Sequence, residues 1–268
     1  MFKDKLLVGQ YYTADSPVHR LSPSVKILIS LIYMISLFVV DYWSGWLFLT
    51  AVCVLFVCLS RVPLGYLWQG TRMILVFCLI TVLINIFIHP GERLLWSCGF
   101  LHLYAEGLSF GLSMGLRLLL LVSFASMLTL TTSPMALTDG LEKLLSPVGK
   151  IGFPVHEIAM MMSIALRFIP TILEEMDRII LAQRARGARI GEGNLLCRLK
   201  SFAPLVVPMF VSAFRRAEEL AQAMDARCYR GGSGRSKWKP DLWCGRDKAV
   251  LIVFAALLLL SVAGRIIL

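Results

Sequence analysis

The side chains that most often carry out catalysis or bind metals are few and scattered in this sequence. Its four histidines form no His-Glu-x-x-His pattern and its seven cysteines form no Cys-x-x-Cys pair, so the usual spacings of metal and redox sites are missing. A Gly-x-x-x-x-Gly-Lys-Ser/Thr stretch is also missing, which excludes that route to binding nucleotide phosphates. We therefore expect no catalytic, cofactor or metal site in this chain. The histidines are His19, His89, His102 and His156.

Two triplets with a central arginine are the strongest candidates for a specific role. They stand 41 positions apart, each at the end of a segment with helical apolar spacing. A guanidinium pairs with carboxylates or backbone carbonyls, and small neighbours let it enter a groove of another protein. In the first triplet, Gly187 also suits the left-handed residue that ends many helices. The triplets are Ala185-Arg186-Gly187 and Ala226-Arg227-Cys228.

Basic residues in a membrane protein also have a simpler explanation. Cytoplasmic loops keep an excess of positive charge, and each Lys or Arg near anionic lipid contributes about 1 kcal/mol. A single triplet would favour that explanation. Two similar triplets on successive helices instead favour docking on two similar sockets, as in a dimeric or pseudo-dimeric partner.

The segments that carry the two triplets are predicted to be amphipathic helices. Apolar residues recur at helical spacing from Val155 to Ile180 and again from Phe202 to Met224, with charged residues between them. Because Pro170 lacks an N–H donor, we expect the first of these helices to kink or restart there. A shorter element, Met135 to Leu145, lies between Pro134 and Pro147.

The composition shows that these helices belong to a membrane protein. Of 268 residues, 57% are hydrophobic and 16% are charged, yet the net charge is +10. Soluble domains have about 25% charged residues, and disordered chains lack this hydrophobicity. A membrane helix needs about 20 mostly apolar residues, and five runs approach that length. They are Val25 to Val40, Trp46 to Leu59, Met73 to Ile88, Leu108 to Leu130 and Ala249 to Leu268.

The distribution of charge predicts the orientation and the domains. Of the 27 Lys and Arg residues, 18 lie between Ser133 and Lys248, so this part is expected in the cytoplasm. Lys3 and Lys5 precede a polar stretch rather than a cleavable signal, and Arg93 is the one basic residue of the outer loops. We expect an all-α polytopic protein with a cytoplasmic amino terminus: membrane domain 1–132, cytoplasmic coupling-helix domain 133–247, last membrane helix 248–268.

Charged groups inside the apolar runs are rare. Asp41, Glu92 and Glu106 fall at the ends of predicted helices, and Arg117 alone lies well inside a run. We expect Arg117 to pair with a polar group on a neighbouring helix or to extend toward the interface. An ion-coupled carrier would place ionisable residues at the membrane midplane, and a membrane enzyme would gather catalytic groups at the interface. The sequence shows neither pattern, but both remain alternatives.

Glycine recurs at every fourth position at the start of the fourth apolar run. Such a stripe lets two membrane helices approach closely and gain packing energy. The partner helix can belong to this chain or to a separate membrane protein, and the sequence leaves both open. The glycines are Gly107, Gly111 and Gly115.

Several stretches of the chain together carry a family pattern: His19 to Lys26, Tyr104 to Leu118, Thr131 to Pro134, Leu144 to Pro154, Ala165 to Pro170 with Glu174-Glu175, and the two arginine triplets. In combination, these stretches resemble the transmembrane T component, or EcfT/CbiQ family, of energy-coupling factor (ECF) ABC-type transporters. The resemblance covers most of the chain from about His19 to Tyr229. It departs from the family at Cys228, where glycine is common, and at Ser22-Pro23-Ser24, where Asp-Pro-Arg is common.

The resemblance implies a coupling scaffold without an active site of its own. Two ABC-type ATPase subunits, identical or homologous, would bind ATP and Mg and receive the arginine triplets. A substrate-binding S component in the membrane would carry a vitamin or a transition-metal ion. The scaffold would lie in the lipid bilayer of the bacterial inner membrane. Nucleic acid is not an expected partner, because topology and anionic lipid already explain the basic residues.

Overall fold

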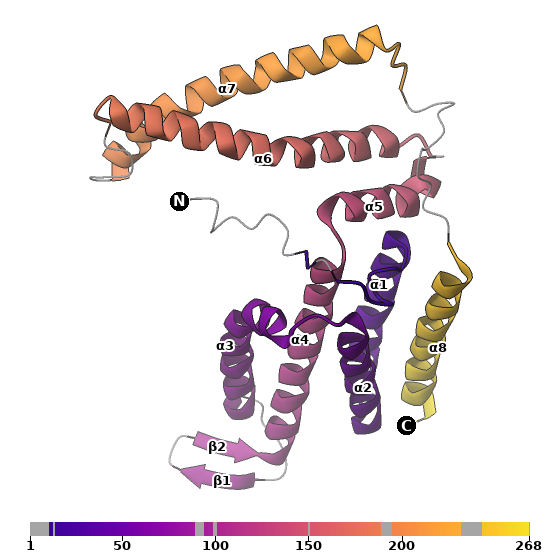
Figure 1. The fold of residues 1–268 in the computed structure, drawn as a ribbon. Coiled ribbons are helices and arrows are strands. Elements are labelled where there is room, and N and C mark those ends of the chain that lie inside the picture. Colours follow the sequence, from indigo (N-terminus) through magenta and orange to yellow (C-terminus); the bar gives the residue numbers. More distant parts are fainter. Residues whose placement is uncertain are drawn as a thin grey trace. The chain divides into compact units, whose positions relative to one another are not determined.

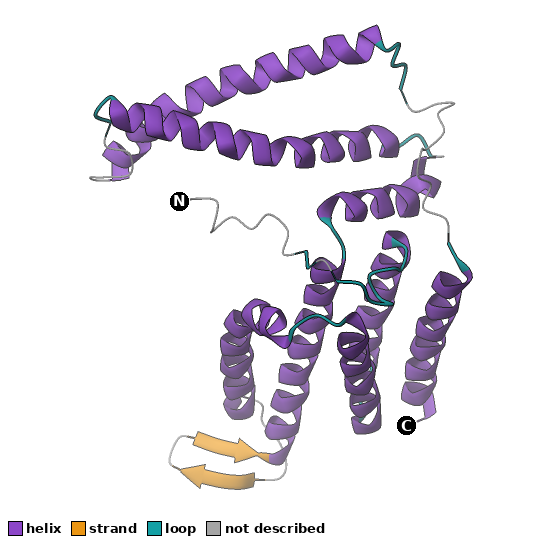
Figure 2. Ribbon diagram, viewed as in Figure 1, coloured by secondary structure: helices purple, strands orange, loops and turns teal. Residues whose placement is uncertain are grey.

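The computed structural model describes residues 11–12, 14–88, 94–98, 101–149, 151–188, 195–231 and 243–267. Lys3, Lys5 and Arg93, on which the predicted orientation partly rests, lie outside these residues. Helices dominate the described chain (Figures 1 and 2). The elements are α1 (Pro23–Val39), α2 (Trp43–Ser60), α3 (Leu64–Ile88), β1 (Leu94–Cys98), β2 (Leu101–Tyr104), α4 (Ala105–Thr131), α5 (Pro134–Gly149), α6 (Val155–Ala185), α7 (Leu195–Ala226) and α8 (Gly245–Ile267).

The chain forms two compact units. Of the described residues, the membrane unit comprises those within Gly9–Lys143 and Asp241–Leu268, and the helical-pair unit comprises those within Leu144–Pro240. The first ten residues of α5 therefore belong with the membrane helices, whereas α6 and α7 make up most of the other unit. The chain leaves the membrane unit within α5 and returns to it just before α8.

Each of the five predicted apolar runs forms a helix, and the structure confirms a helical polytopic membrane protein. Among the described helices, α2, α4, α6 and α8 are long and apolar enough to cross a membrane. The apolar parts of α1 and α3 are shorter, Pro23–Val39 and Ile74–Ile86. The length and composition of α6 thus also suit a membrane span, although we expect this helix in the cytoplasm from its charge pattern.

The core of the membrane unit is built around α1. Its side chains pack against α2, α4 and α8 in one cluster of buried apolar residues. The ring of Tyr33 stacks on Phe124 of α4 with centroids 4.1 Å apart, and its hydroxyl donates a hydrogen bond to the carbonyl of Leu49 in α2 at 3.1 Å. Tyr33 therefore ties three helices together with both an apolar face and a polar tip.

Helices α3 and α4 form the most extensive helix pair of the membrane unit. The glycine stripe on α4 faces α3: a β-carbon added at Gly111 would lie 3.1 Å from the carbonyl oxygen of Val82, and one added at Gly115 would collide with the Val82 side chain. Gly107 is also buried. At Gly111 and Gly115 the stripe thus packs against a helix of the same chain, which explains the need for residues without a side chain.

A β-hairpin joins α3 and α4, and it is not among the elements that the sequence predicts. Strands β1 and β2 pair antiparallel, with Ser97 opposite His102. Figure 2 shows these strands in orange at one end of the helices. The hairpin adds a small sheet to an otherwise helical set of described elements.

Proline did not end helices where we expected it to. We expected the short element to stop before Pro147, but α5 continues to Gly149. At Pro170 we expected a kink or a restart; α6 does not restart there, because it is one continuous helix from Val155 to Ala185. Each internal proline removes one hydrogen-bond donor. Tertiary packing of an amphipathic face provides most of a helix's stability, so this loss need not end the helix.

Candidate docking interface

The first arginine triplet ends α6 in a Schellman motif. Ala185 is the last helical residue, Arg186 is the C-cap, and Gly187 follows with φ of 85°. The N–H of Gly187 donates to the carbonyl of Arg184 at 2.9 Å, and the N–H of Ala188 donates to that of Gln183 at 3.0 Å. These two bonds satisfy terminal carbonyls of the helix. The left-handed role that the sequence suggested for Gly187 is confirmed.

The second triplet ends α7 with the same hydrogen bonds. Ala226 is the last helical residue, and Cys228 has φ of 56°. The N–H of Cys228 donates to the carbonyl of Asp225 at 2.9 Å, and the N–H of Tyr229 donates to that of Met224 at 3.1 Å. Arg227 therefore occupies the same place in its cap as Arg186 does in the other.

Cys228 adopts the left-handed conformation although it is not glycine. An L-residue in this region of φ and ψ costs about 1–2 kcal/mol because its β-carbon crowds the next carbonyl. The sequence alone did not determine the backbone conformation of the turn at this position. With cysteine at this position the cap has the same two hydrogen bonds as the α6 cap, at the cost of backbone strain.

Both central arginines are available for contact with another protein. All six residues of the two triplets are exposed. Neither Arg186 nor Arg227 forms an ion pair within the part of the chain that the structure describes. An exposed, unpaired guanidinium at the tip of a rigid helix can form a bidentate contact with a carboxylate.

Two further arginines gather around Arg227. A cavity of about 620 Å³ lies next to Arg227. Arg167 of α6 and Arg230 line it together with Arg227, and Met160 and Met224 supply its apolar part. The sequence alone predicts no docking role for Arg167 or Arg230. Arg167 is 60 positions from Arg227, so only the pairing of the two helices brings them together.

Helices α6 and α7 run antiparallel, as Figure 1 shows. Arg216 of α7 pairs with Glu175 of α6 at 3.1 Å, and its guanidinium lies 5.4 Å from the ring centroid of Phe168. A mostly apolar crevice of about 310 Å³ lies between the helices beside this pair. The ion pair thus fixes one register of two apolar faces that could otherwise slide.

The antiparallel pairing places the two central arginines at opposite ends of the helical pair. Arg227 shares its cavity with Met160 and Arg167, whereas Arg186 lies beyond the other end of α6. Arg186 follows these two residues by 26 and 19 positions. At 1.5 Å per residue, the two arginines are roughly 30–40 Å apart along α6.

In the membrane unit, Asp247 joins the beginnings of α1 and α8. Its carboxylate accepts hydrogen bonds from the N–H of Ser22 at 3.1 Å and from the N–H of Cys244 at 2.9 Å. The residue is 4% exposed. Ser22 and Cys244 precede the two helices, so one buried carboxylate satisfies N–H groups at both helix starts.

The segments on either side of the helical pair also contact the start of α1. Trp243 donates a hydrogen bond from Nε1 to the hydroxyl of Ser24 at 2.9 Å, and the Lys143 ammonium of α5 lies 4.8 Å from the Trp243 ring centroid. A β-carbon at Gly140 of α5 would lie 2.9 Å from the backbone nitrogen of Ser24. In place of the family's usual charged residues, Ser22 and Ser24 thus contribute hydrogen bonds.

The segment before α1 is fixed by His19 and Lys26. The Lys26 ammonium donates to the carbonyls of Thr131 at 2.9 Å and His19 at 3.2 Å. His19 Nε2 lies 2.9 Å from the carbonyl oxygen of Tyr12, which can only accept, so Nε2 carries the proton and Nδ1 accepts from the Ser16 hydroxyl. Burial lowers the pKa of His19, which favours this neutral form.

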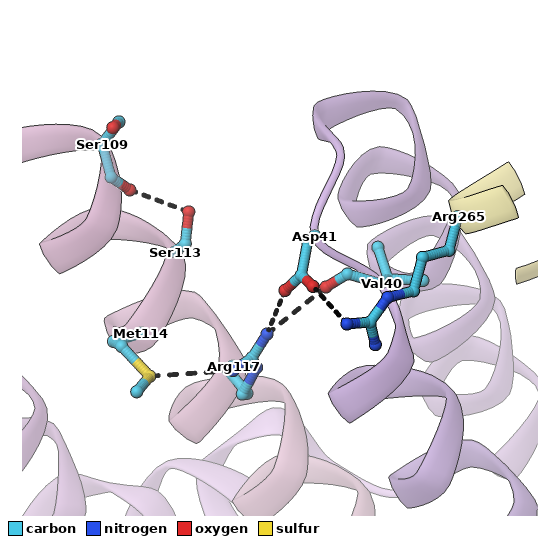
Figure 3. A network of polar contacts seen from close by, with 7 residues as sticks. All are labelled: Val40, Asp41, Ser109, Ser113, Met114, Arg117 and Arg265. Atoms are coloured by element: carbon cyan, nitrogen blue, oxygen red, sulfur yellow. Dashed lines mark hydrogen bonds and ion pairs between the residues drawn. The ribbon is translucent and has the colours of Figure 1, made fainter. Parts of the chain in front are cut away.

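Arg117 forms the ion pair with a neighbouring segment that the sequence suggested (Figure 3). Its guanidinium lies 3.1 Å from the carboxylate of Asp41 and donates to the carbonyl of Val40 at 3.3 Å. Its cationic face lies 5.2 Å from the ring centroid of Trp46. Arg265 of α8 reaches the other oxygen of Asp41 at 3.7 Å. Arg117 therefore links α4 to the α1–α2 connection.

These observations define a multi-pass helical membrane protein with a pair of amphipathic helices that end in matching arginine caps. Within the described residues, no group of three His, Cys, Asp or Glu side chains could hold a metal ion.

Comparison with known proteins identifies the family. A model of the CbiQ family, described as "Cobalt transport protein", matches residues 14–238. The "Energy-coupling factor transporter transmembrane protein EcfT" of Clostridium kluyveri is 48% identical over 267 residues, covering 99% of this chain and 98% of that protein. The protein of the same description from Bacillus subtilis is 43% identical over 258 residues, covering 95% and 97%. The chain belongs to the EcfT/CbiQ family of transmembrane components of energy-coupling factor transporters.

Proposed function

We propose that this chain couples two ATPase subunits to a substrate-binding S component in an ATP-driven importer. The observation that carries the proposal is the pair of matching caps. Arg186 and Arg227 have the same backbone surroundings, are exposed, and lie at opposite ends of an antiparallel helical pair. Two similar caps roughly 30–40 Å apart suit two similar sockets on two subunits.

The ATPase subunits supply the chemistry in this proposal. They bind ATP and Mg, and each receives one helix end in a groove that offers carboxylates or backbone carbonyls to the arginine. Closure of the ATPase pair then moves α6 and α7. The chain itself transmits movement and carries out no catalytic step.

The helical pair belongs on the cytoplasmic side of the membrane, where ATP is available. The apolar length of α6 would suit a span, but its second half carries Glu174, Glu175, Asp177 and Arg178 within five positions. Burying such charges in hydrocarbon is costly. The excess of Lys and Arg between residues 133 and 248 favours the same side. The amino terminus is then cytoplasmic, and the protein lies in the bacterial inner membrane.

An exposed apolar stripe on α7 is the proposed contact for the S component. Its side chains repeat every four residues, so they lie on one face of the helix. They are large and 44% to 71% exposed, which is unusual for a surface that faces water alone. The S component in this proposal carries a vitamin or a transition-metal ion. The stripe consists of Phe202, Val206, Phe210 and Phe214.

Movement of the helical pair can reach the membrane unit through the start of α1. Both chain segments that link the two units, α5 and the residues before α8, make contacts there through Gly140, Trp243 and Asp247. A displacement of either link therefore acts on the same turn of the same membrane helix. This convergence supports a role in transmission rather than simple anchoring.

Reversal of the arginine charges tests the docking role. Arg186→Glu and Arg227→Glu are expected to leave the protein in the membrane but to weaken copurification of the ATPases and substrate uptake, with the double variant worst. Removing one partner of a desolvated charge pair costs about 2–5 kcal/mol, so each single variant should lose at least tenfold in ATPase affinity. Arg215→Glu is the matched control, because Arg215 is an exposed arginine on α7 away from both caps.

Two results would overturn the proposal. The first is normal ATPase binding and uptake in the double variant. The second is substrate transport by the chain reconstituted alone in vesicles without ATPase subunits, which would instead indicate a self-sufficient secondary carrier.

A further inference from the structure

A long apolar groove lies between α2 and α8 on the membrane unit. It has a volume of about 1070 Å³. The two helices approach at its base, where the rings of Phe56 and Phe254 meet edge to face with centroids 6.3 Å apart. Apolar side chains of both helices line the walls, from Phe48 to Leu59 on α2 and from Ala249 to Leu260 on α8.

The groove has the length of one bilayer leaflet. Each wall spans 11 positions, which correspond to roughly 17 Å of helix. The hydrocarbon core of a bilayer is about 30 Å thick, so one leaflet is about 15 Å. The extended acyl chains of a single phospholipid would therefore fill the groove from end to end.

Positive charge gathers at one end of this groove. Arg20, Arg61 and Arg246 line that end, together with Asp15. Arg20 is already paired with Asp15 through two hydrogen bonds of 2.8 and 2.7 Å, and this contact holds the pKa of Asp15 below its usual value. Arg61 and Arg246 have no ion pair within the described residues.

The backbone of Arg61 supports a specific use of this end. Arg61 is the C-cap of α2 and has φ of 54°, a left-handed conformation that glycine or asparagine would adopt at lower cost. Strained residues of this kind cluster at functional sites. Here the conformation presents a long cationic side chain at the mouth of an apolar groove.

We propose that the groove between α2 and α8 binds one anionic phospholipid, with its acyl chains along the apolar walls and its phosphate between Arg61 and Arg246. The planar guanidinium can donate two hydrogen bonds to two oxygens of one phosphate, because its fork of N–H groups matches their spacing. A net positive mouth favours a lipid with net negative charge over a zwitterionic one. A hydrophobic helix of another protein would fit the walls but would leave Asp15, which is already paired with Arg20, as the one acidic group for three arginines in the lining that the structure describes.

The test compares two lipids with identical acyl chains on the full-length protein purified in detergent and stripped of lipid. Binding of phosphatidylglycerol and phosphatidylcholine is followed by native mass spectrometry. Each cation near an anionic headgroup contributes about a fivefold gain. The first phosphatidylglycerol molecule should therefore bind roughly 25-fold more tightly than phosphatidylcholine.

The charge variant is Arg61→Gln combined with Arg246→Gln, which should remove this preference. Its control is Arg72→Gln combined with Lys248→Gln, which removes two exposed charges outside the groove and should keep the preference. Equal binding of the two lipids by the unaltered protein would overturn the proposal. So would an equal loss of preference in the charge variant and its control.

The second variant fills the groove with large side chains. Leu55→Trp combined with Val253→Trp changes two side chains that are 60% and 62% exposed, so folding should be retained. Binding of both lipids should fall, whereas Leu47→Trp with Ile252→Trp, on the same helices but outside the groove, should leave it unchanged. Unaltered lipid binding in the filled variant would overturn the proposal. Loss of a copurifying membrane protein from the filled variant, without loss of lipid, would assign the groove to that protein instead.

Discussion

The left-handed residue at the end of α7 gives a sharp prediction, because the same cap occurs twice with different residues. Cys228 has φ of 56° and Gly187 has φ of 85°. Replacing Cys228 with glycine should remove about 1–2 kcal/mol of backbone strain. Glycine also makes the unfolded chain more flexible, which stabilises the unfolded state and cancels about 0.4–1 kcal/mol of this gain. The net expected stabilisation of the cap is therefore about 0.5–1 kcal/mol.

Gly187→Ala is the opposite experiment. The alanine β-carbon would be placed in the left-handed region, where nothing else crowds it, so strain alone determines the result. The α6 cap should lose about 0.5–1 kcal/mol by the same arithmetic. Gly245→Ala is the control, since Gly245 lies in the first turn of α8 without a positive φ. It should leave both caps unchanged.

Amide hydrogen exchange in the full-length protein measures these local effects directly. The informative amides are those of Cys228 and Tyr229 for α7 and of Gly187 and Ala188 for α6, because their N–H groups make the cap hydrogen bonds. Protection should rise about two- to fivefold at the first pair in Cys228→Gly and fall about as much at the second in Gly187→Ala. Changes of the same sign in both variants would refute the reasoning.

Three further contacts give predictions for the stability of the protein. Reversal of either charge in the Glu175–Arg216 pair should weaken the helical pair, and the double reversal should restore part of the lost stability. A double-mutant cycle measured by chemical unfolding should give a coupling energy of about 0.5–1 kcal/mol. A coupling energy of zero would contradict this prediction. Asp247→Asn should cost about 1–3 kcal/mol, since a buried N–H loses its acceptor. Thermal unfolding should show this loss but little change for the exposed control Asp15→Asn. Asp41→Asn should cost less than about 1 kcal/mol in the same assay, because the side chain is 60% exposed.

The helices of this protein were largely predictable from its sequence. Each apolar run became a helix, because a segment in lipid must satisfy its backbone hydrogen bonds internally. The apolar spacing from Val155 predicted the start of α6 correctly. The end of α6 was also predictable, since Gly187 adopts the left-handed conformation at little cost.

The polar contacts that join distant segments were not predictable. Asp247 binds the N–H of Ser22 across 225 positions, and Trp243 binds Ser24 across 219. No local pattern marks such pairs, because each residue looks like an ordinary helix-end residue on its own. The place of Arg167 was not predictable for the same reason, because the antiparallel pairing of α6 and α7 brings it to the cavity at Arg227.

The ends of α6 and α7 show that hydrogen bonding, not residue identity, defines their common structure. A search that required glycine after the arginine would find Gly187 and reject Cys228. Yet both residues have positive φ, and both caps contain the same two hydrogen bonds. The left-handed geometry costs an L-residue about 1–2 kcal/mol. Cysteine is tolerated at this position because the packing of the 32-residue helix can offset that cost. Arg227 consequently has the same position in its cap as Arg186, and the two helix ends still match although cysteine stands where the other cap has glycine.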